Sequence, residues 1–306
     1  MPPFAALLGS WIINAFWPLV GQDGVRHFST TLFFHAATVV ALLALAPWLA
    51  LRGRWRLALS PAIAKPVFGM AVLSGAASWI YFEALRYTSP ANAAVMAQVE
   101  VLYSALLAAW LLGERIGRGQ VAASCLVVAG TGLIMAQDLG SLRWKGDLMI
   151  LLTPWMYQLA HVLAKRLPKD TDPVVLAGAR MAQLSLLLVP FTAWTLLHEP
   201  LWTWSREGLS CLALQGVVMN ALSLTLWYTA ILRMDLAKAS AFLLSYPALT
   251  MLFSWGLGRE TIGLWQVAGL VVTLSGAFWL SLIALARRPP GLPRAPADPA
   301  FESSRA

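Results

Sequence analysis

Long apolar runs alternate along this chain with short connections rich in Gly, Pro and Arg. Each run holds about 20 residues, the length that an α-helix needs to cross the roughly 30 Å hydrocarbon core of a bilayer. The pattern therefore predicts ten transmembrane helices. Their expected ranges are 4–20, 31–51, 66–86, 89–112, 119–137, 148–166, 174–197, 209–232, 236–257 and 263–286.

Composition excludes an ordinary soluble protein. Of 306 residues, 59% are apolar and 12% are charged, whereas soluble domains are about 45–50% apolar and about 25% charged. The apolar excess must face lipid, so the predicted fold class is an all-α integral membrane protein. Ten spans leave about 100 residues for connections and tails, which excludes a separate catalytic domain. The segment 287–306, rich in Pro and Arg, is expected to be a disordered cytoplasmic tail.

The charge distribution predicts the orientation in the membrane. A net charge of +8 would suggest a nucleic-acid partner in a soluble protein, but here the cations form short clusters between apolar runs. With the N-terminus in the cytoplasm, 15 Lys and Arg residues fall on inside connections and tails and six on outside connections. The positive-inside rule then predicts a plasma (inner) membrane protein with both termini cytoplasmic and the connection 138–147 outside. We expect lipid and a small-molecule substrate as partners, and no nucleic acid.

An internal repeat divides the chain into two halves. The stretch 81–134 resembles 227–280 at a constant offset of 146, which pairs Glu114 with Glu260. We therefore predict one five-helix unit at 1–138 and a second at 147–286.

An odd number of helices per unit places the second copy upside down relative to the first. Closer to the start of each unit, an offset of 144 pairs Trp11 with Trp155 and Asn14 with Gln158. Inverted five-helix repeats are typical of secondary transporters, which bind substrate near the midplane between the halves.

Several motifs carry a resemblance to a known family over residues 4–286. They are LLGERI at Leu111–Ile116, its partner GLGRETI at Gly256–Ile262, the segment EALRYTSPANAAV, and the pair Tyr246-Pro247. In order and spacing these motifs resemble the EamA-type ten-helix members of the drug/metabolite transporter superfamily. Val101 stands where the family pattern has a proline. The resemblance implies a metabolite exporter, with amino acid export as the leading expectation, and leaves the cargo open.

Glu100 is the main candidate for chemistry, because it lies about twelve residues into the fourth predicted helix, near the bilayer centre. An intramembrane carboxyl indicates function by default, since exposing its charge to lipid is costly. Tyr103 shares its helix face, and Tyr246 is its repeat mate. Three roles stay open: a proton carrier, a partner for a substrate ammonium group, or a structural hydrogen-bond partner between helices.

Other polar residues lie at matched depths in the two units. Asn14 and Gln158, each one turn from Trp11 or Trp155, suit a cavity lining or an interhelical hydrogen bond. His161, one turn beyond Gln158, is interpreted either as a proton shuttle or as a packing residue.

Four further residues are assigned positions or roles on weaker signals. Tyr81 and Trp227 are expected in the interfacial aromatic belt. Asn220, deeper in the eighth helix, is a second lining candidate. Arg180 is expected to extend toward the headgroups, with binding of a substrate carboxylate as the alternative.

Enzyme motifs are missing from the sequence. It has no GxSxG, HExxH, GxxxxGK[ST] or Gly-rich dinucleotide loop, and its four histidines and two cysteines show no ligand spacing. We expect no cofactor, no metal and no catalysis, so that transport is driven by gradients, with protons as a candidate coupling ion. The alternative function is a membrane-embedded lipid-modifying enzyme or lipid-binding scaffold.

Overall fold

The computed structural model is all-α over the part of the chain that it describes. Its one β feature there is an isolated antiparallel bridge between Phe28 and Trp202. The predicted all-α membrane fold is confirmed: five described helices are long and apolar enough to cross a membrane, and two shorter apolar helices accompany them. The described residues are 2–51, 54–55, 60–100, 102–103, 117–138, 143–165, 167–168, 171–198, 202, 204–233 and 246–286.

The helices follow the predicted apolar runs, and most observed ends lie within five residues of the expected ones. The predicted sixth and eighth helices are each formed by several consecutive segments. The elements are α1 (Pro3–His27), α2 (Thr30–Leu51), α4 (Pro61–Ala84), α5 (Pro90–Met96), η1 (Ala97–Val99), α7 (Arg118–Asp138), α8 (Arg143–Leu151), α9 (Pro154–Lys165), α10 (Pro173–His198), α11 (Arg206–Ala213), η2 (Leu214–Ser223), α12 (Leu224–Ile231), α14 (Tyr246–Gly256) and α15 (Leu264–Ala286).

Some sequence-based predictions lie outside the described residues. They concern the tail 287–306, the first copy of the helix-end motif at Leu111–Ile116 with Glu114, and Val101.

Serine and proline start several of the helices. In α5, Ser89 accepts a hydrogen bond at its Oγ from Asn92 N at 3.2 Å, and Pro90 follows it. Ser205 caps α11 in the same way, accepting from Gly208 N at 3.0 Å. A serine cap satisfies one of the free N–H groups of the first turn, and proline has no N–H to leave free.

Three of the spans depart from regular α-helix along their length. The fourth tightens into the 3₁₀ turn η1 just before Glu100, the eighth contains the π-helix η2, and the sixth breaks between α8 and α9. The break has a local cause: Pro154 lacks an N–H and its ring clashes with the preceding turn. The freed carbonyls find other donors, since Tyr103 Oη donates to Leu151 O at 3.1 Å and Thr153 Oγ1 to Ile150 O at 2.9 Å.

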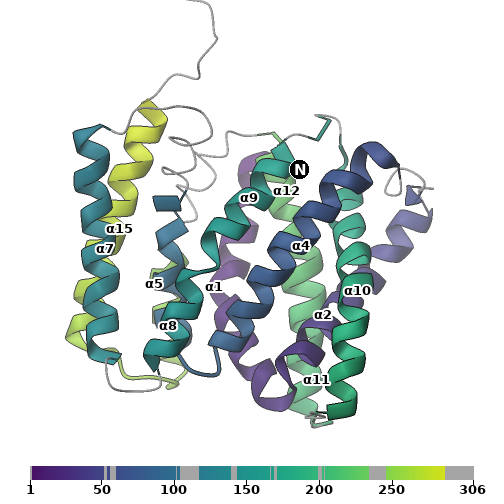
Figure 1. Ribbon diagram of the computed structural model, residues 1–306, viewed down its shortest axis with the longest axis horizontal. Coiled ribbons are helices and arrows are strands. Elements are labelled where there is room, and N and C mark those ends of the chain that lie inside the picture. The colour runs from purple at the N-terminus through teal and green to yellow at the C-terminus, as the bar shows by residue number, and fades with distance from the viewer. Residues whose placement is uncertain are drawn as a thin grey trace, which may run out of the picture.

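Helices α7 and α15 pack side by side at one edge of the molecule, the left edge in Figure 1. Glycines allow this close approach: a Cβ on Gly130 would lie 2.5 Å from Thr273 N, and one on Gly276 would lie 2.8 Å from Val127 N. With the repeat offset of 146, Gly276 is the mate of Gly130 and Thr273 the mate of Val127. Each contact is therefore matched by its mate, as a twofold axis between two antiparallel helices requires.

The same reciprocity extends to other helix pairs. Helix α1 packs on α12, and its mate α9 packs on α4; helix α2 packs on η2, and its mate α10 also packs on α4. Likewise α1 contacts α14, and α8 contacts α5. Matched contacts of this kind are what an inverted repeat produces. In Figure 1 the start of α1 and the end of α15 lie at the same end of the molecule, as an even number of spans requires.

Candidate functional site

A cluster of polar side chains surrounds Glu100 where the fourth, sixth and eighth spans meet. Glu100 follows directly on η1, and 33% of its side-chain surface stays accessible although the residue lies inside the helix assembly. Gln158 Nε2 of α9 donates a hydrogen bond to Glu100 Oε1. Among the described residues no Lys or Arg pairs with this carboxyl. Glu100 therefore combines a neutral amide donor with uncovered surface.

His161 of α9 is the second neighbour of the carboxyl, with its Nδ1 4.0 Å from Glu100 Oε1. On the opposite side of the ring, Trp227 Nε1 donates to His161 Nε2 at 3.3 Å, and the two ring centroids are 5.3 Å apart. An indole N–H can only donate. The neutral imidazole must then carry its proton on Nδ1, the nitrogen nearer to Glu100.

Tyrosines complete the surroundings of Glu100. Tyr157 Oη and Ser78 Oγ share a hydrogen bond of 2.9 Å between α9 and α4. Tyr246, the first described residue of the ninth span, lies within electrostatic range of both Glu100 and Tyr157. The structure therefore brings Glu100, Gln158, His161 and Tyr246 together.

The expected belt position of Tyr81 and Trp227 is wrong. Tyr81 is 2% exposed and packs on Trp17 with the ring centroids 4.4 Å apart, and Trp227 is 7% exposed and packs against His161. Both rings point inward because the helix faces that carry them pack against other helices.

The expected extension of Arg180 toward the headgroups is also wrong. Its side chain is buried, and Nη1 donates to Tyr228 Oη of α12 at 2.9 Å. Arg180 lies within electrostatic range of His161 and Tyr157.

Asn14 belongs to a separate polar group between α1 and η2. Its amide donates to Ser10 Oγ at 3.2 Å and accepts from Ser223 Oγ at 3.4 Å. Among the described residues no hydrogen bond joins this group to Glu100, so its contacts match the interhelical alternative. Asn220 Oδ1 accepts from Gln215 Nε2 at 3.3 Å within η2.

The remaining sequence candidates contribute in different ways. Tyr103 supports the break between α8 and α9 through its bond to Leu151 O. Trp11 is half-buried on α1, and Trp155 is 37% exposed. No hydrogen bond or ring contact among the described residues joins Trp155 to Glu100.

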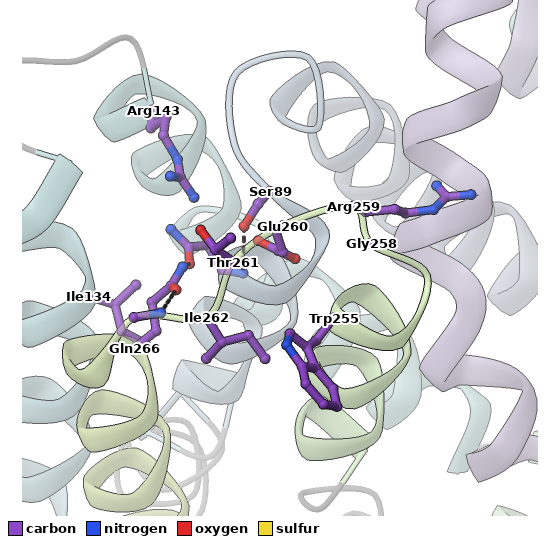
Figure 2. Close-up of a pocket in the computed structure, with 12 residues that line it drawn as sticks. Ser89, Ile134, Arg143, Trp255, Gly258, Arg259, Glu260, Thr261, Ile262 and Gln266 are labelled. Atoms are coloured by element: carbon purple, nitrogen blue, oxygen red, sulfur yellow. Dashed lines mark hydrogen bonds between the residues drawn. The ribbon is translucent and has the colours of Figure 1, made fainter.

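A second polar region is a pocket of about 840 Å³ at the end of the molecule where α5, α8 and α15 begin. Figure 2 shows Arg143 pointing toward Thr261, with Trp255 and Ile262 on the far side. Gln266 links two parts of the wall, donating to Asn92 Oδ1 at 2.9 Å and accepting from Gly263 N at 2.9 Å.

The connection between α14 and α15 is tied to two other helices beside this pocket. Arg259 turns away from the pocket (Figure 2) and forms a bidentate ion pair with Asp23 of α1 at 2.6 and 2.7 Å. Glu260 Oε1 accepts from Ala91 N of α5 at 3.3 Å and from Ser254 Oγ. Gly258 turns the chain with φ of +67°, which favours glycine. Glu260 thus joins the connection to α5 and to the end of α14.

Sequence reasoning missed Tyr157 and Ser78, and it placed Trp227 outside the site. A usable signal existed for Tyr157, since it adjoins Gln158 in the sequence. The sequence held no such signal for Ser78 and Trp227, because their positions beside the cluster depend on how α4 and α12 are rotated about their axes.

Comparison with known proteins identifies a transporter family that matches most of the chain. A model of the EamA-like transporter family matches residues 2–136 and again 144–282. An uncharacterized transporter of Bacillus subtilis, YyaM, is 26% identical over 214 residues, which cover 66% of this chain and 68% of that protein. An uncharacterized transporter of Archaeoglobus fulgidus is 23% identical over 205 residues, 64% of this chain and 68% of that protein.

The chain is also similar to a plant protein and to a protein of known structure. A chloroplastic WAT1-related protein of Arabidopsis thaliana is 25% identical over 203 residues, 63% of this chain and 48% of that protein. A protein known from a crystal structure has a TM-score of 0.64 and 21% identity, covering 92% of this chain and 97% of that chain. At this identity the structural likeness shows the fold alone.

Proposed function

The chain belongs to the EamA-like transporter family, and we propose that it moves a small organic solute across the membrane by alternating access. Export of an amino acid or a similar metabolite is the activity that the family resemblance favours. We assign the coupling ion as a proton that enters from outside, so that the inward proton gradient drives solute out.

The observation that carries this proposal is the environment of Glu100. Its carboxyl accepts from Gln158 and has His161 4.0 Å away, and a third of its side-chain surface is uncovered. A carboxylate in a low-dielectric interior, with no Lys or Arg paired to it among the described residues, favours any positive species that can reach it. A proton and a substrate ammonium group both qualify.

One shared carboxylate explains exchange in a simple way. When Glu100 holds a proton it is neutral and has little affinity for an ammonium group, and when it holds the ammonium group it cannot hold the proton. Occupation by one therefore excludes the other, and the two move in opposite directions.

The irregular spans around Glu100 support this location. The 3₁₀ turn η1, the break before Pro154 and the π-helix η2 all lie within spans that contribute to the cluster. Secondary transporters typically bind cargo where their helices are discontinuous, since such segments expose backbone groups and can bend.

The test is Glu100→Gln in proteoliposomes, with a panel of labelled amino acids and an imposed pH gradient. Glutamine keeps the volume and the hydrogen bond to Gln158 but cannot titrate. We expect gradient-driven accumulation to fall to background while the variant still folds. Glu207→Gln, an exposed carboxylate at the start of α11, is the matched control and should transport as the parent does.

Binding separates the two roles of Glu100. If the carboxyl binds the ammonium group, affinity should fall about tenfold or more in Glu100→Gln, because a charge-assisted hydrogen bond is lost. If it serves the proton alone, binding should persist. Normal accumulation by Glu100→Gln across the pH range would contradict both roles and leave a structural carboxyl.

A further inference from the structure

Arg180 is a buried cation whose charge lacks a matching anion among the described residues. Its side chain is 8% exposed, and its one hydrogen bond there runs from Nη1 to the neutral Tyr228 Oη. The Nε atom is buried and has no partner within the described part of the chain. Arg180 is the eighth residue of α10, about 10 Å from the start of that helix.

Two other arginines in the described part of the chain each have a carboxylate partner. Arg259 forms a bidentate pair with Asp23, and Arg86 lies 3.3 Å from Glu83 Oε2. Both are more exposed than Arg180, and so need an anion less. Removing a guanidinium from water is unfavourable unless an anion compensates for the lost hydration. A buried arginine without one is therefore expected to serve a ligand.

The position of Arg180 relative to Glu100 indicates which ligand. Arg180 acts electrostatically on Tyr157 and His161 of α9, and Glu100 acts on Tyr157 and lies 4.0 Å from His161. A positive and a negative side chain therefore share the same two neighbours on one helix. This arrangement suits a small molecule that carries both charges.

We propose that Arg180 binds the carboxylate of the cargo while Glu100 binds its ammonium group. With Nη1 held by Tyr228, the Nε side of the guanidinium is left for the carboxylate, and a carboxylate matches that fork with two parallel hydrogen bonds. The site then selects zwitterions of the amino acid class over amines that have lost the carboxylate. This selectivity rests on the proposed function, which supplies the transport step and the role of Glu100.

The experiment compares binding to the purified protein in lipid nanodiscs. The probes are the standard amino acids, each paired with the amine that its decarboxylation yields, for example phenylalanine with phenethylamine. For the parent protein, at least one amino acid should bind about tenfold or more tightly than its amine, because the amine cannot make the charge-assisted pair.

Arg180→Gln should remove this preference and leave the affinity for the amine unchanged within about twofold. Arg206→Gln, an exposed arginine at the start of α11, is the control and should keep the preference. Arg180→Lys keeps the positive charge but lacks the fork, so it should give an intermediate preference. If Arg180→Gln fails to fold, the Lys variant supplies the comparison.

A purely structural role for Arg180 would lower binding of the amino acid and the amine together. Such a parallel loss of affinity would overturn the proposal. So would an unchanged preference for the amino acid in both variants, or the lack of any preference in the parent protein. Failure of the proposed function would give a different result. The preference for the amino acid over its amine would still depend on Arg180, but proteoliposomes would accumulate no solute. Transport without an Arg180-dependent preference would reject the inference alone.

Discussion

At the scale of single residues, the interior of the molecule holds two opposite charges that do not neutralise each other directly. Glu100 is bonded to an amide and Arg180 to a phenol. Burial costs several kcal/mol per ion, which is a large share of the roughly 5–15 kcal/mol that stabilises a typical native protein. Stability alone does not explain two such residues, whereas a doubly charged cargo between them would compensate both.

The proton position on His161 is a prediction at this scale. Because Trp227 donates to Nε2, the neutral ring should carry its proton on Nδ1, and Trp227→Phe should release that constraint. Nitrogen NMR of labelled histidine measures it, with His161→Gln to assign the signal. We expect the Nδ1–H tautomer in the parent protein and a mixture in Trp227→Phe. A dominant Nε2–H form in the parent would contradict the hydrogen bond.

At the scale of helices, the regular spans and the irregular spans are expected to move differently during transport. Helices α7 and α15 are continuous and pack through glycines, where backbones approach closely. The fourth, sixth and eighth spans contain a 3₁₀ turn, a break and a π-helix. We expect the α7–α15 pair to move as a rigid body and the irregular spans to change shape, because their backbone hydrogen bonds already depart from the regular α-helical pattern.

Glycine substitutions on α7 test the rigid pair. A Cβ on Gly130 would lie 2.3 Å from Thr273 Oγ1 and 2.5 Å from Thr273 N, whereas one on Gly132 would meet nothing within 4 Å. Gly130→Ala should therefore destabilise the protein by about 1–3 kcal/mol through overpacking, seen as a lower Tm in detergent. Gly132→Ala, two residues away on the same helix, is the control and should leave the Tm unchanged or raise it. Equal Tm values for the two variants would show that the pair can separate at little cost.

At the scale of the whole molecule, the described helices contact one another in matched pairs, whereas the side chains at matched positions differ in chemistry. The repeat mate of Glu100 is Tyr246, and that of Trp227 is Tyr81. Asn14, the mate of Gln158, bonds to serines elsewhere. In the proposed mechanism the two halves exchange conformations and so alternate access, and their unequal side chains give the proposed charged site no matching copy among the described residues.

Orientation in the membrane is the prediction at this scale. Single cysteines at Gly117 and Glu207, both exposed, would be made in a background with Cys125→Ala and Cys211→Ala. Three spans separate the two positions, so a membrane-impermeant thiol reagent should reach Gly117→Cys only from the cytoplasm and Glu207→Cys only from outside. Labelling from the same side would contradict the odd number of spans, and the reverse pattern would contradict the charge-based orientation.

The sequence by itself determined the helical class, the approximate ends of the spans and the family motifs. These features are local: length and hydropathy decide whether a segment can cross a bilayer, and caps such as Ser89 mark its start. The expected depth of Glu100 near the bilayer centre came from counting along its helix and stays a prediction. Its neighbours Gln158 and His161 were likewise candidates because polar side chains are rare at that depth.

Only the tertiary structure decided which way each helix is rotated. Arg180, Tyr81 and Trp227 were expected at the membrane interface, and all three point into the protein. In a soluble protein, water on one side would have revealed the buried face as a hydrophobic stripe. In a bilayer the lipid tails are as apolar as the core, so hydropathy does not distinguish the two faces of a helix, and packing against the neighbouring helices sets the rotation.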